Sequence, residues 1–478
     1  MHRSRSNIVA LAVAALAFQA CQEQREPTEP MRRAALTASM TPADPAGRHL
    51  VVFAAERVPA DLGERVARLG GTVEAALGSI GVAAVTGLSE TGAAELAASA
   101  DIRAVEPDPI IRGQDDDEAT DDPTEQPTSE AAVPADATAS PTTARFYARQ
   151  WNIRAVFANQ AWAAGFLGSR DVKVAILDSG IDYLHPDLAG LVDLEHSTSF
   201  VPEDVTRHYP GRLPFSDLHG HGTFVTSIVA SNANVVAGIN RYVTLLAVKI
   251  NDSTRASSAS RFLSGIVYAA DQGADVINIS DGRQFNKKNS PGTIAAFERA
   301  VNYAFRKGAL LVTVPFNDAA DLDHNGDLVR LPCEAANAIC AAATGPTSSA
   351  GAEGPWENVD APAPYSAFGR SAISVAAPGG TLPLFTKVWL PCTTTPSATT
   401  PRPECRAHQP VAQSLGTSFA APHVAGLAAL LVAQLGHGNP ALIRARILQS
   451  ADDLGEPGTD PYYGKGRINI ARALGIVQ

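Results

Sequence analysis

Five continuous runs of apolar residues, each the length of a strand, constrain most strongly what this chain can fold into. They are Val172–Asp178, Val243–Ile250, Ala274–Ser280, Ala309–Val314 and Ala372–Pro378. A strand with one face in water alternates apolar and polar residues, whereas a strand covered on both faces reads as a continuous apolar run. Helix-like segments, such as Gly220–Ser231 and Ser258–Gly273, lie between these runs. The sequence therefore predicts an α/β domain with a parallel central sheet between helix layers.

A smaller unit with a different pattern precedes that domain. Its strand-like segments are His49–Ala54, Val82–Leu88 and Ile102–Arg112, and its helix-like segments are Ala60–Gly71 and Ser89–Ser99. Two strand–helix–strand passes in so short a stretch predict a small α+β domain over residues 48–112. We expect Ser89 to cap the start of the second helix.

Acidic residues between these two units account for most of the net charge. Residues 113–144 contain nine Asp or Glu and no Lys or Arg, so they carry −9 of the formal net charge of −11. This stretch is rich in Pro, Ser and Thr and lacks apolar periodicity, which is typical of a disordered linker. The rest of the chain is close to neutral and has no basic stripe of the kind that nucleic-acid binding requires. We therefore predict no nucleic-acid partner.

The first 21 residues have the layout of an export signal, with two arginines, an apolar run over residues 8–18 and then small residues. The run is too short to span a bilayer as a mature helix. Cys21 follows Ala20 where bacterial lipoprotein signals are cut and lipidated, although Phe18 stands where leucine is usual. The alternative is ordinary cleavage after an alanine. Either way we expect an extracytoplasmic protein, secreted or lipid-anchored at the cell envelope through Cys21, with residues 22–47 as a tether.

Cysteine spacing fits an exported protein. With Cys21 set aside as a signal residue, four cysteines remain. Two local disulfides, Cys333–Cys340 and Cys392–Cys405, are the simplest of three possible connectivities. A zinc site is the alternative, but the spacings are not C-x2-C and no histidine is suitably placed nearby.

Polar residues after the buried runs carry the candidate chemistry, because ligands of open parallel sheets bind beyond the carboxyl ends of the strands. Asp178 ends the first run, His221 stands between two glycines, and Ser418 begins a helical segment in SLGTSFAAPHVAGLAALL. A serine hydroxyl needs an imidazole to take its proton, and the imidazole needs a carboxylate to fix its tautomer. Separately, the three could be a strand-end cap, a loop histidine and a helix N-cap. Together they predict nucleophilic acyl transfer.

Pro422 lies in the same segment as Ser418. We expect this proline in the first turn of the helix, where its missing N–H costs little.

The order Asp, His, Ser differs from the order Ser, acid, His of the α/β-hydrolases. The segments D-S-G-I-D, G-H-G-T-F-V and G-T-S-F-A-A-P-H-V-A-G resemble the three signature blocks of the subtilisin-like serine proteases. The resemblance extends from Gln150 to the end of the chain. It implies Asp178 as the orienting acid, His221 as the general base and Ser418 as the nucleophile.

The same resemblance implies how the chain is divided. Residues 1–21 would be the signal, residues 48–112 an inhibitor-type propeptide, and residues 145–478 a subtilisin-like catalytic domain. The propeptide would act as an intramolecular inhibitor until a cut between Arg112 and Arg145.

Asn317 is the residue that the resemblance offers for the oxyanion hole, beside the N–H of Ser418. An ordinary turn asparagine is the alternative. The family usually has A-G-N here, whereas this chain has Pro315-Phe316-Asn317, and Asp281 stands where leucine is usual. We expect Phe316 to narrow the primary specificity pocket, and our hypothesis is a pocket that favours small or basic side chains.

We expect no cofactor for catalysis, but structural calcium is common among the subtilisin-like proteases. Asp321, Asp323 and Asn325 match the D-x-D-x-N-G beginning of an EF-type loop, yet position twelve is Pro332 rather than glutamate. We therefore interpret this segment as a solvated acidic loop, with a calcium loop as the alternative. Asp187 matches a calcium ligand of the family. Three polar residues near the triad are otherwise interpreted as structural or surface groups: Asp182, Asp187 and His219.

The sequence thus predicts an exported serine endopeptidase that acts on protein or peptide substrates and is made as a self-inhibited precursor. Two alternatives stay open. The unusual residues 281, 315 and 316 are the only support for an inactive, surface-anchored pseudoprotease that binds peptides. An esterase could use the same triad.

Overall fold

The computed structural model describes residues 47–112, 117–121, 140–394 and 410–477. The predicted signal, the lipid site at Cys21, the tether and Cys405 lie outside these ranges. So does most of the predicted linker. Where that linker is described, the prediction of a stretch without secondary structure is wrong for β6 (Asp117–Asp121) and for a turn of 3-10 helix, η2 (Pro141–Thr143). Backbone pairing with a strand far along the chain explains β6.

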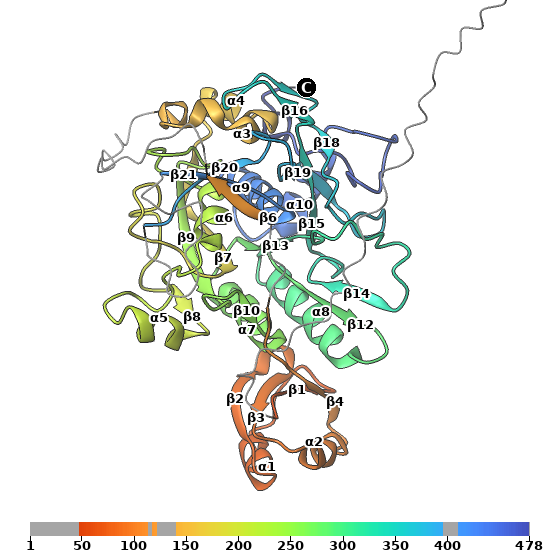
Figure 1. The fold of residues 1–478 in the computed structure, drawn as a ribbon. Coiled ribbons are helices and arrows are strands. Elements are labelled where there is room, and N and C mark those ends of the chain that lie inside the picture. Colours follow the sequence, from red (N-terminus) through yellow and green to blue (C-terminus); the bar gives the residue numbers. More distant parts are fainter. Residues whose placement is uncertain (1–46, 113–116, 122–139, 395–409, 478) are drawn as a thin grey trace, which may run out of the picture. The chain divides into compact units, whose positions relative to one another are not determined.

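The N-terminal domain is a four-stranded antiparallel sheet with two helices, drawn in orange in Figure 1. Its elements are β1 (His49–Phe53), α1 (Leu62–Arg68), β2 (Thr72–Leu77), β3 (Val82–Thr86), α2 (Glu90–Ala97) and β4 (Ile102–Pro107), with a 3-10 turn η1 (Gly78–Ile80). The strand order is β2-β3-β1-β4. The sequence analysis missed β2. Ser89 accepts a hydrogen bond from the Gly92 N–H at 3.1 Å, which confirms the predicted cap.

The second domain is built on a central sheet of eight strands in which parallel pairs dominate. These strands are β7 (Gly168–Asp178), β8 (Thr198–Ser199), β9 (Tyr242–Lys249), β11 (Val276–Ile279), β13 (Leu310–Thr313), β15 (Ile339–Gly345), β18 (Ala361–Pro362) and β19 (Val375–Pro378). The order is β18-β15-β13-β11-β7-β9-β8, and β19 also pairs with β15. All five predicted runs are strands, and β15 was not predicted.

Helices cover both faces of this sheet, as predicted. One face packs against α6 (His221–Val229) and α9 (Thr417–Leu435), and the other against α7 (Ala259–Asp271) and α8 (Pro291–Arg306). Alternate residues of β7 reach the two cores, because successive side chains of a strand point to opposite faces. The helices lie around the sheet in Figure 1.

The remaining elements are short. The other helices are α3 (Trp151–Ala155), α4 (Ala158–Ala163), α5 (Pro202–His208), α10 (Pro440–Gln449), α11 (Ile470–Ala473) and the 3-10 turn η3 (Tyr147–Arg149). The other strands are β5 (Ile111–Arg112), β10 (Ala256–Ser257), β12 (Arg283–Asn286), β14 (Leu328–Leu331), β16 (Ser348–Ser349), β17 (Trp356–Glu357), β20 (Val388–Pro391) and β21 (Val411–Leu415).

The disulfide Cys333–Cys340 is present, as predicted. Cys392 is buried, and its pairing with Cys405 stays a prediction.

Helix α9 is the centre of the fold. Among the described residues it is long and apolar enough to cross a membrane, but 83% of that stretch is buried inside the protein. Its position in contact with the sheet makes it a core helix.

His423 is a buried histidine of α9 whose two ring nitrogens are both engaged. Its Nδ1 donates to the Phe419 carbonyl at 2.7 Å, and its Nε2 lies 2.9 Å from Nδ2 of Asn152, which donates to it. Burial lowers the pKa of His423 to about 4. The ring is therefore neutral in the folded protein at pH values where an unfolded histidine takes up a proton.

This histidine predicts a loss of stability in acid. Above pH 6.5 the ring is neutral in both the folded and the unfolded protein, so it does not lower the stability. As the pH falls from 6.5 towards 4, only the unfolded protein takes up the proton, and the free energy of unfolding falls by a total of about 3 kcal/mol. We expect the free energy of unfolding of the Ser418→Ala protein, measured by urea titration, to fall over that range. The added change His423→Gln should flatten the fall, whereas His208→Gln, on the exposed side of α5, should leave it unchanged. An unaltered slope in His423→Gln contradicts the prediction.

Candidate active site

Asp178 is the last residue of β7 and is fully buried. His221 donates its Nδ1 hydrogen to both carboxylate oxygens of Asp178, at 2.8 Å to Oδ1 and 2.9 Å to Oδ2. The Ser179 N–H donates to Oδ1 at 2.7 Å. The structure thus brings together the first two residues of the predicted triad, and the hydrogen bond on Nδ1 makes Nε2 the ring atom that can accept a proton.

The carboxyl group of Asp178 is held in its ionised form. Burial alone would raise the pKa of this carboxyl, but the charge and the hydrogen bond of His221 outweigh that effect, with smaller contributions from Arg255 and the Ser179 N–H. The net result is a pKa below the ordinary range. The site therefore keeps a carboxylate beside the imidazole down to low pH.

His221 is placed by glycines at the start of α6. Gly220 has a φ of +99°, a left-handed conformation that favours glycine. A Cβ on Gly222 would lie 2.1 Å from the carbonyl oxygen of Gly180, so only glycine lets α6 approach the end of β7 this closely. The two glycines that flank the histidine in the sequence thus have a packing reason.

Asp217 supports the same turn and was missed by the sequence analysis. Its carboxylate accepts hydrogen bonds from the Ser179 hydroxyl at 2.9 Å, from the N–H groups of His219 and Gly220, and from both the N–H and the hydroxyl of Thr223. This one side chain ties the end of β7 to the first turn of α6. No capping pattern marks Asp217 in the sequence, because the N-cap position of α6 is Gly220 and Asp217 lies three residues earlier.

Ser418 is the second residue of α9 and is 3% exposed. Its Oγ lies 3.2 Å from the Ser280 carbonyl, to which it donates. The ring of the next residue, Phe419, is centred 6.0 Å from the His221 ring. All three predicted triad residues therefore lie at the carboxyl end of the sheet.

Pro422 is not in the first turn of α9, so that prediction is wrong. The helix begins at Thr417, and Pro422 lies inside it. Its missing N–H leaves the Ser418 carbonyl without the usual helical donor, and the Ser280 hydroxyl donates to that carbonyl at 2.8 Å. Ser280 and Ser418 are thus joined by two reciprocal hydrogen bonds.

Asn317 lies beside Ser418 in space. Its Oδ1 accepts hydrogen bonds from the Thr417 N–H at 2.9 Å and the Thr417 hydroxyl at 2.8 Å. These contacts fix the plane of the amide and direct its Nδ2 donor to the opposite side. The role of Asn317 in an oxyanion hole stays a prediction.

Phe316 adopts a left-handed conformation with a φ of +83°. The Arg330 guanidinium lies 5.0 Å from the centre of its ring and donates to the Pro315 carbonyl at 2.7 Å. A Cβ on Gly282 would lie 2.7 Å from the Phe316 ring. The ring therefore packs against the backbone that follows β11, and the narrowing of a specificity pocket stays a prediction.

Asp281 forms an ion pair with Arg283. Its Oδ1 accepts from Arg283 at 3.0 Å and from the Gly282 N–H at 2.7 Å, and its Oδ2 accepts from Asn251 at 3.0 Å. A carboxylate paired in this way is a poor partner for a basic substrate side chain. Of the two preferences in our hypothesis, these contacts favour small side chains.

Aspartates at the two candidate calcium positions make hydrogen bonds within the protein. Asp187 accepts three backbone N–H groups, from Asn234 and Val235 on Oδ1 and from Val236 on Oδ2. Asp323 accepts from the N–H groups of residues 370 and 371 and from the Ser371 hydroxyl. Within the described ranges no group of three or more acidic, His or Cys side chains is placed to hold a metal. The contacts of Asp323 fit a structural loop better than an EF-type site.

Asp182 also makes structural contacts. It is buried, and its Oδ2 accepts from the Thr393 hydroxyl and from the N–H and hydroxyl of Thr394. The partly buried ring of His219 lies edge-on to the His221 ring, 6.4 Å away.

The site contains a buried aspartate that is hydrogen-bonded to a histidine, a serine at a helix N-terminus and an amide beside that serine. These groups are typical of a serine hydrolase that works by acyl transfer. Comparison with known proteins narrows this class. The Subtilase family matches residues 169–466. Thermitase of Thermoactinomyces vulgaris is 33% identical over 341 residues, which are 70% of this chain and 99% of thermitase.

A second relative supports the family, and a solved structure shares the fold. Subtilisin E of Bacillus subtilis (strain 168) is 30% identical over 311 residues, covering 65% of this chain and 67% of that protein. The structure of the epidermin leader peptide processing serine protease of Staphylococcus aureus superposes with a TM-score of 0.66, at 20% identity, over 90% of this chain and 98% of that one. The chain belongs to the subtilase family and is a subtilisin-type serine endopeptidase.

The packing of Phe316 yields a prediction on specificity. Phe316→Gly should widen the pocket and relieve the left-handed conformation, so that larger side chains are accepted before the cut. A library of peptide substrates, read by mass spectrometry, measures this preference. The control Phe157→Gly relieves a left-handed conformation of the same kind, with a φ of +61° just before α4, and should leave the preference as it is. An unchanged preference in Phe316→Gly would defeat the narrowing hypothesis.

Proposed function

We propose that this protein cleaves peptide bonds with Asp178, His221 and Ser418 as acid, base and nucleophile. The Ser418 Oγ attacks the carbonyl carbon, and its proton passes to Nε2 of His221. That proton then goes to the leaving amine, which departs and leaves an acyl-enzyme. Water hydrolyses the acyl-enzyme with the same base. The buried hydrogen bond between His221 and Asp178 is the observation that carries the proposal.

Two donors would stabilise the oxyanion of this reaction. One is the N–H of Ser418 at the start of α9, and the other is Nδ2 of Asn317. The hydrogen bond from the Thr417 N–H to Oδ1 of Asn317 supports this role, because it orients the amide before the substrate binds. Subtilases need no cofactor for this chemistry, and we assign no calcium site.

A fluorophosphonate probe tests the proposed activity. The processed protein should be labelled on Ser418, and Ser418→Ala should not. Failure to label the processed wild-type protein would favour the pseudoprotease alternative. An active protein that hydrolyses esters but no peptide would favour the esterase.

We further propose that residues 48–112 are the inhibitory propeptide of this enzyme. Glu106 supports the idea. It accepts from the N–H groups of Gly292 and Thr293 at 2.6 and 2.8 Å and from the Thr293 hydroxyl at 2.6 Å. These groups begin α8, whose own N-cap residue, Ser290, makes no side-chain cap. A carboxylate at this position satisfies free N–H groups and complements the helix dipole.

Asp108 makes a similar contact with α7. It accepts from the N–H of Ser260 at 3.2 Å and also from its hydroxyl. Arg48, itself buried, lies 3.3 Å from the Asp108 carboxylate. The end of β4, which holds Glu106, and the residue Asp108 just after it thus supply acidic groups to two helices of the catalytic domain.

Apolar contacts add to these caps. Leu50, Val52 and Ile80 belong to the same buried cluster as residues of α7 and α8. Arg299 of α8 donates to the carbonyls of Phe53 and Ile80. An interface with buried apolar residues and paired charges is what a tight inhibitor requires.

Strand pairing supports self-inhibition. β5 pairs antiparallel with β10, and β6 pairs antiparallel with β21, which ends three residues before Ser418. Extended peptides commonly bind proteins by adding a strand to an exposed edge. We propose that β5 and β6 use the two edges that a peptide substrate would use, and that the activating cut falls between them.

This cut and the export signal can be tested together. Mass spectrometry of the mature protein should find an N-terminus between Arg112 and Asp117. The released N-terminal part would show whether export ends in a lipid on Cys21 or in ordinary cleavage. A mature N-terminus beyond residue 121 would contradict the proposed position of the cut.

The contacts of Glu106 yield a prediction on activation. Glu106→Ala should weaken the complex of propeptide and enzyme by at least about tenfold, because three hydrogen bonds to a buried carboxylate are lost. Processed protein should then become active on a peptide substrate after a shorter lag. Glu95→Ala, on the exposed side of α2, is the matched control. An equal lag in the two variants would count against the inhibitor role.

A further inference from the structure

A hollow in the catalytic domain lies away from the triad. It is lined by eight residues from α8, α10 and two loops: Phe305, Asn337, Ala441, Arg444, Ala445, Leu448, Gln449 and Lys465. Phe305 precedes β13 and Asn337 precedes β15, so the hollow lies near the amino ends of these parallel strands. The triad lies at their carboxyl ends. The volume of the hollow, about 510 Å³, falls in the range of small-molecule sites.

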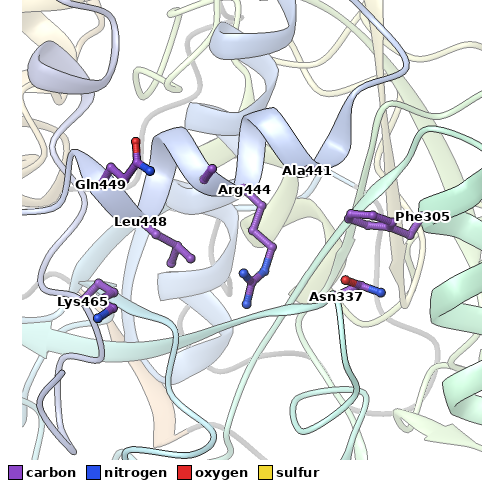
Figure 2. Close-up of a pocket in the computed structure, with 8 residues that line it drawn as sticks. Phe305, Asn337, Ala441, Arg444, Leu448, Gln449 and Lys465 are labelled. Carbon is purple, nitrogen blue, oxygen red and sulfur yellow. The ribbon is translucent and has the colours of Figure 1, made fainter.

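Arg444 is the distinctive residue of this hollow. Figure 2 shows its side chain extending from α10 into the space between Leu448 and Lys465 on one side and Phe305 and Asn337 on the other. Ala441 and Ala445 lie on the same face of the helix as Arg444 and Leu448, and their small side chains leave room beside the guanidinium.

Arg444 is a partly buried cation that has no acidic partner among the described residues. Its Nε is buried and has no hydrogen-bond partner. Throughout the described ranges no carboxylate forms an ion pair with it, and none of the eight lining residues is acidic. Burial lowers the pKa of Arg444, and no acidic group opposes that effect. A partly desolvated cation without a partner is costly, so an anion is what this position lacks.

The other lining residues indicate the rest of the ligand. Lys465 adds a second positive charge, and among the described residues its Nζ donates to the Thr459 hydroxyl alone, at 2.7 Å. Phe305 and Leu448 offer apolar surface on either side of the guanidinium (Figure 2). Arginine binds carboxylates through two parallel hydrogen bonds. The site therefore combines a carboxylate binder with walls for an apolar body.

We propose that this hollow binds an organic carboxylate with an apolar body the size of one amino-acid side chain. The carboxylate would pair with Arg444 and lie near Lys465, and the apolar body would pack between Phe305 and Leu448. A free small acid and the C-terminal residue of a peptide share this chemistry. The inference is independent of the triad and of the proposed mechanism.

The full-length Ser418→Ala protein tests the proposal by isothermal titration with N-acetylphenylalanine and with its amide, which lacks the charge. We expect the acid to bind at least about tenfold more tightly than the amide, because only the acid can form charge-assisted bonds. Arg444→Gln should remove this difference, and Arg444→Lys should reduce it. Arg446→Gln changes an exposed arginine of the same helix and should keep it.

Three results would overturn the proposal. They are equal binding of acid and amide, no binding of either probe, and an effect of Arg446→Gln as large as that of Arg444→Gln. Inorganic phosphate that bound as tightly as the acid would show a plain anion site and refute the apolar part. A dipeptide with a C-terminal phenylalanine distinguishes the two sources, because it binds at least as well as the free acid only if a peptide chain fits.

Discussion

The hydrogen bond between Asp178 and His221 is the interaction on which the rest of the structure depends. It joins the end of the longest strand of the sheet to the first residue of α6, and both side chains are buried. Neither side chain can turn away without leaving the other as a buried polar group that lacks this hydrogen bond. Asp217, Gly180 and Gly222 all act on this junction, by hydrogen bonds or by close approach. The carboxylate, the imidazole and the turn that carries it are positioned as one unit.

The two faces of the sheet serve different tasks. The face covered by α6 and α9 supplies the histidine and the serine, and its core is closed by the buried helix α9. The opposite face, covered by α7 and α8, offers two helix N-termini to the N-terminal domain, where Glu106 and Asp108 cap them. The helix caps that we propose as inhibitory contacts are therefore separate from the catalytic groups, whereas β5 and β6 pair with the edges that we propose for a peptide substrate.

Much of the fold and the site was predictable because the signals were local. Continuous apolar runs marked the buried strands, and glycines beside His221 and Ser418 marked tight backbone positions. By contrast, β15 has three alanines among seven residues, and β2 has two alanines and a glutamate among six. These residues have little preference for strands, so the two segments give a weak local signal.

The remaining features depend on partners far away in the sequence. The Ser280 hydroxyl explains how α9 accommodates Pro422, and Arg283 explains how Asp281 is tolerated near the site. Neither pairing leaves a periodic signal. The same holds for Arg444. In the sequence it is an ordinary helix residue, and only the structure shows that no carboxylate among the described residues pairs with it.

The most direct test of the account is the kinetics of Asp178→Asn, measured on a peptide substrate with processed protein. Asparagine keeps the shape of the side chain but removes the charge and favours the wrong tautomer of His221. If the bond is as central as we argue, kcat should fall by about 10,000-fold while KM changes little. A fall of less than tenfold in a folded, processed variant would contradict the account.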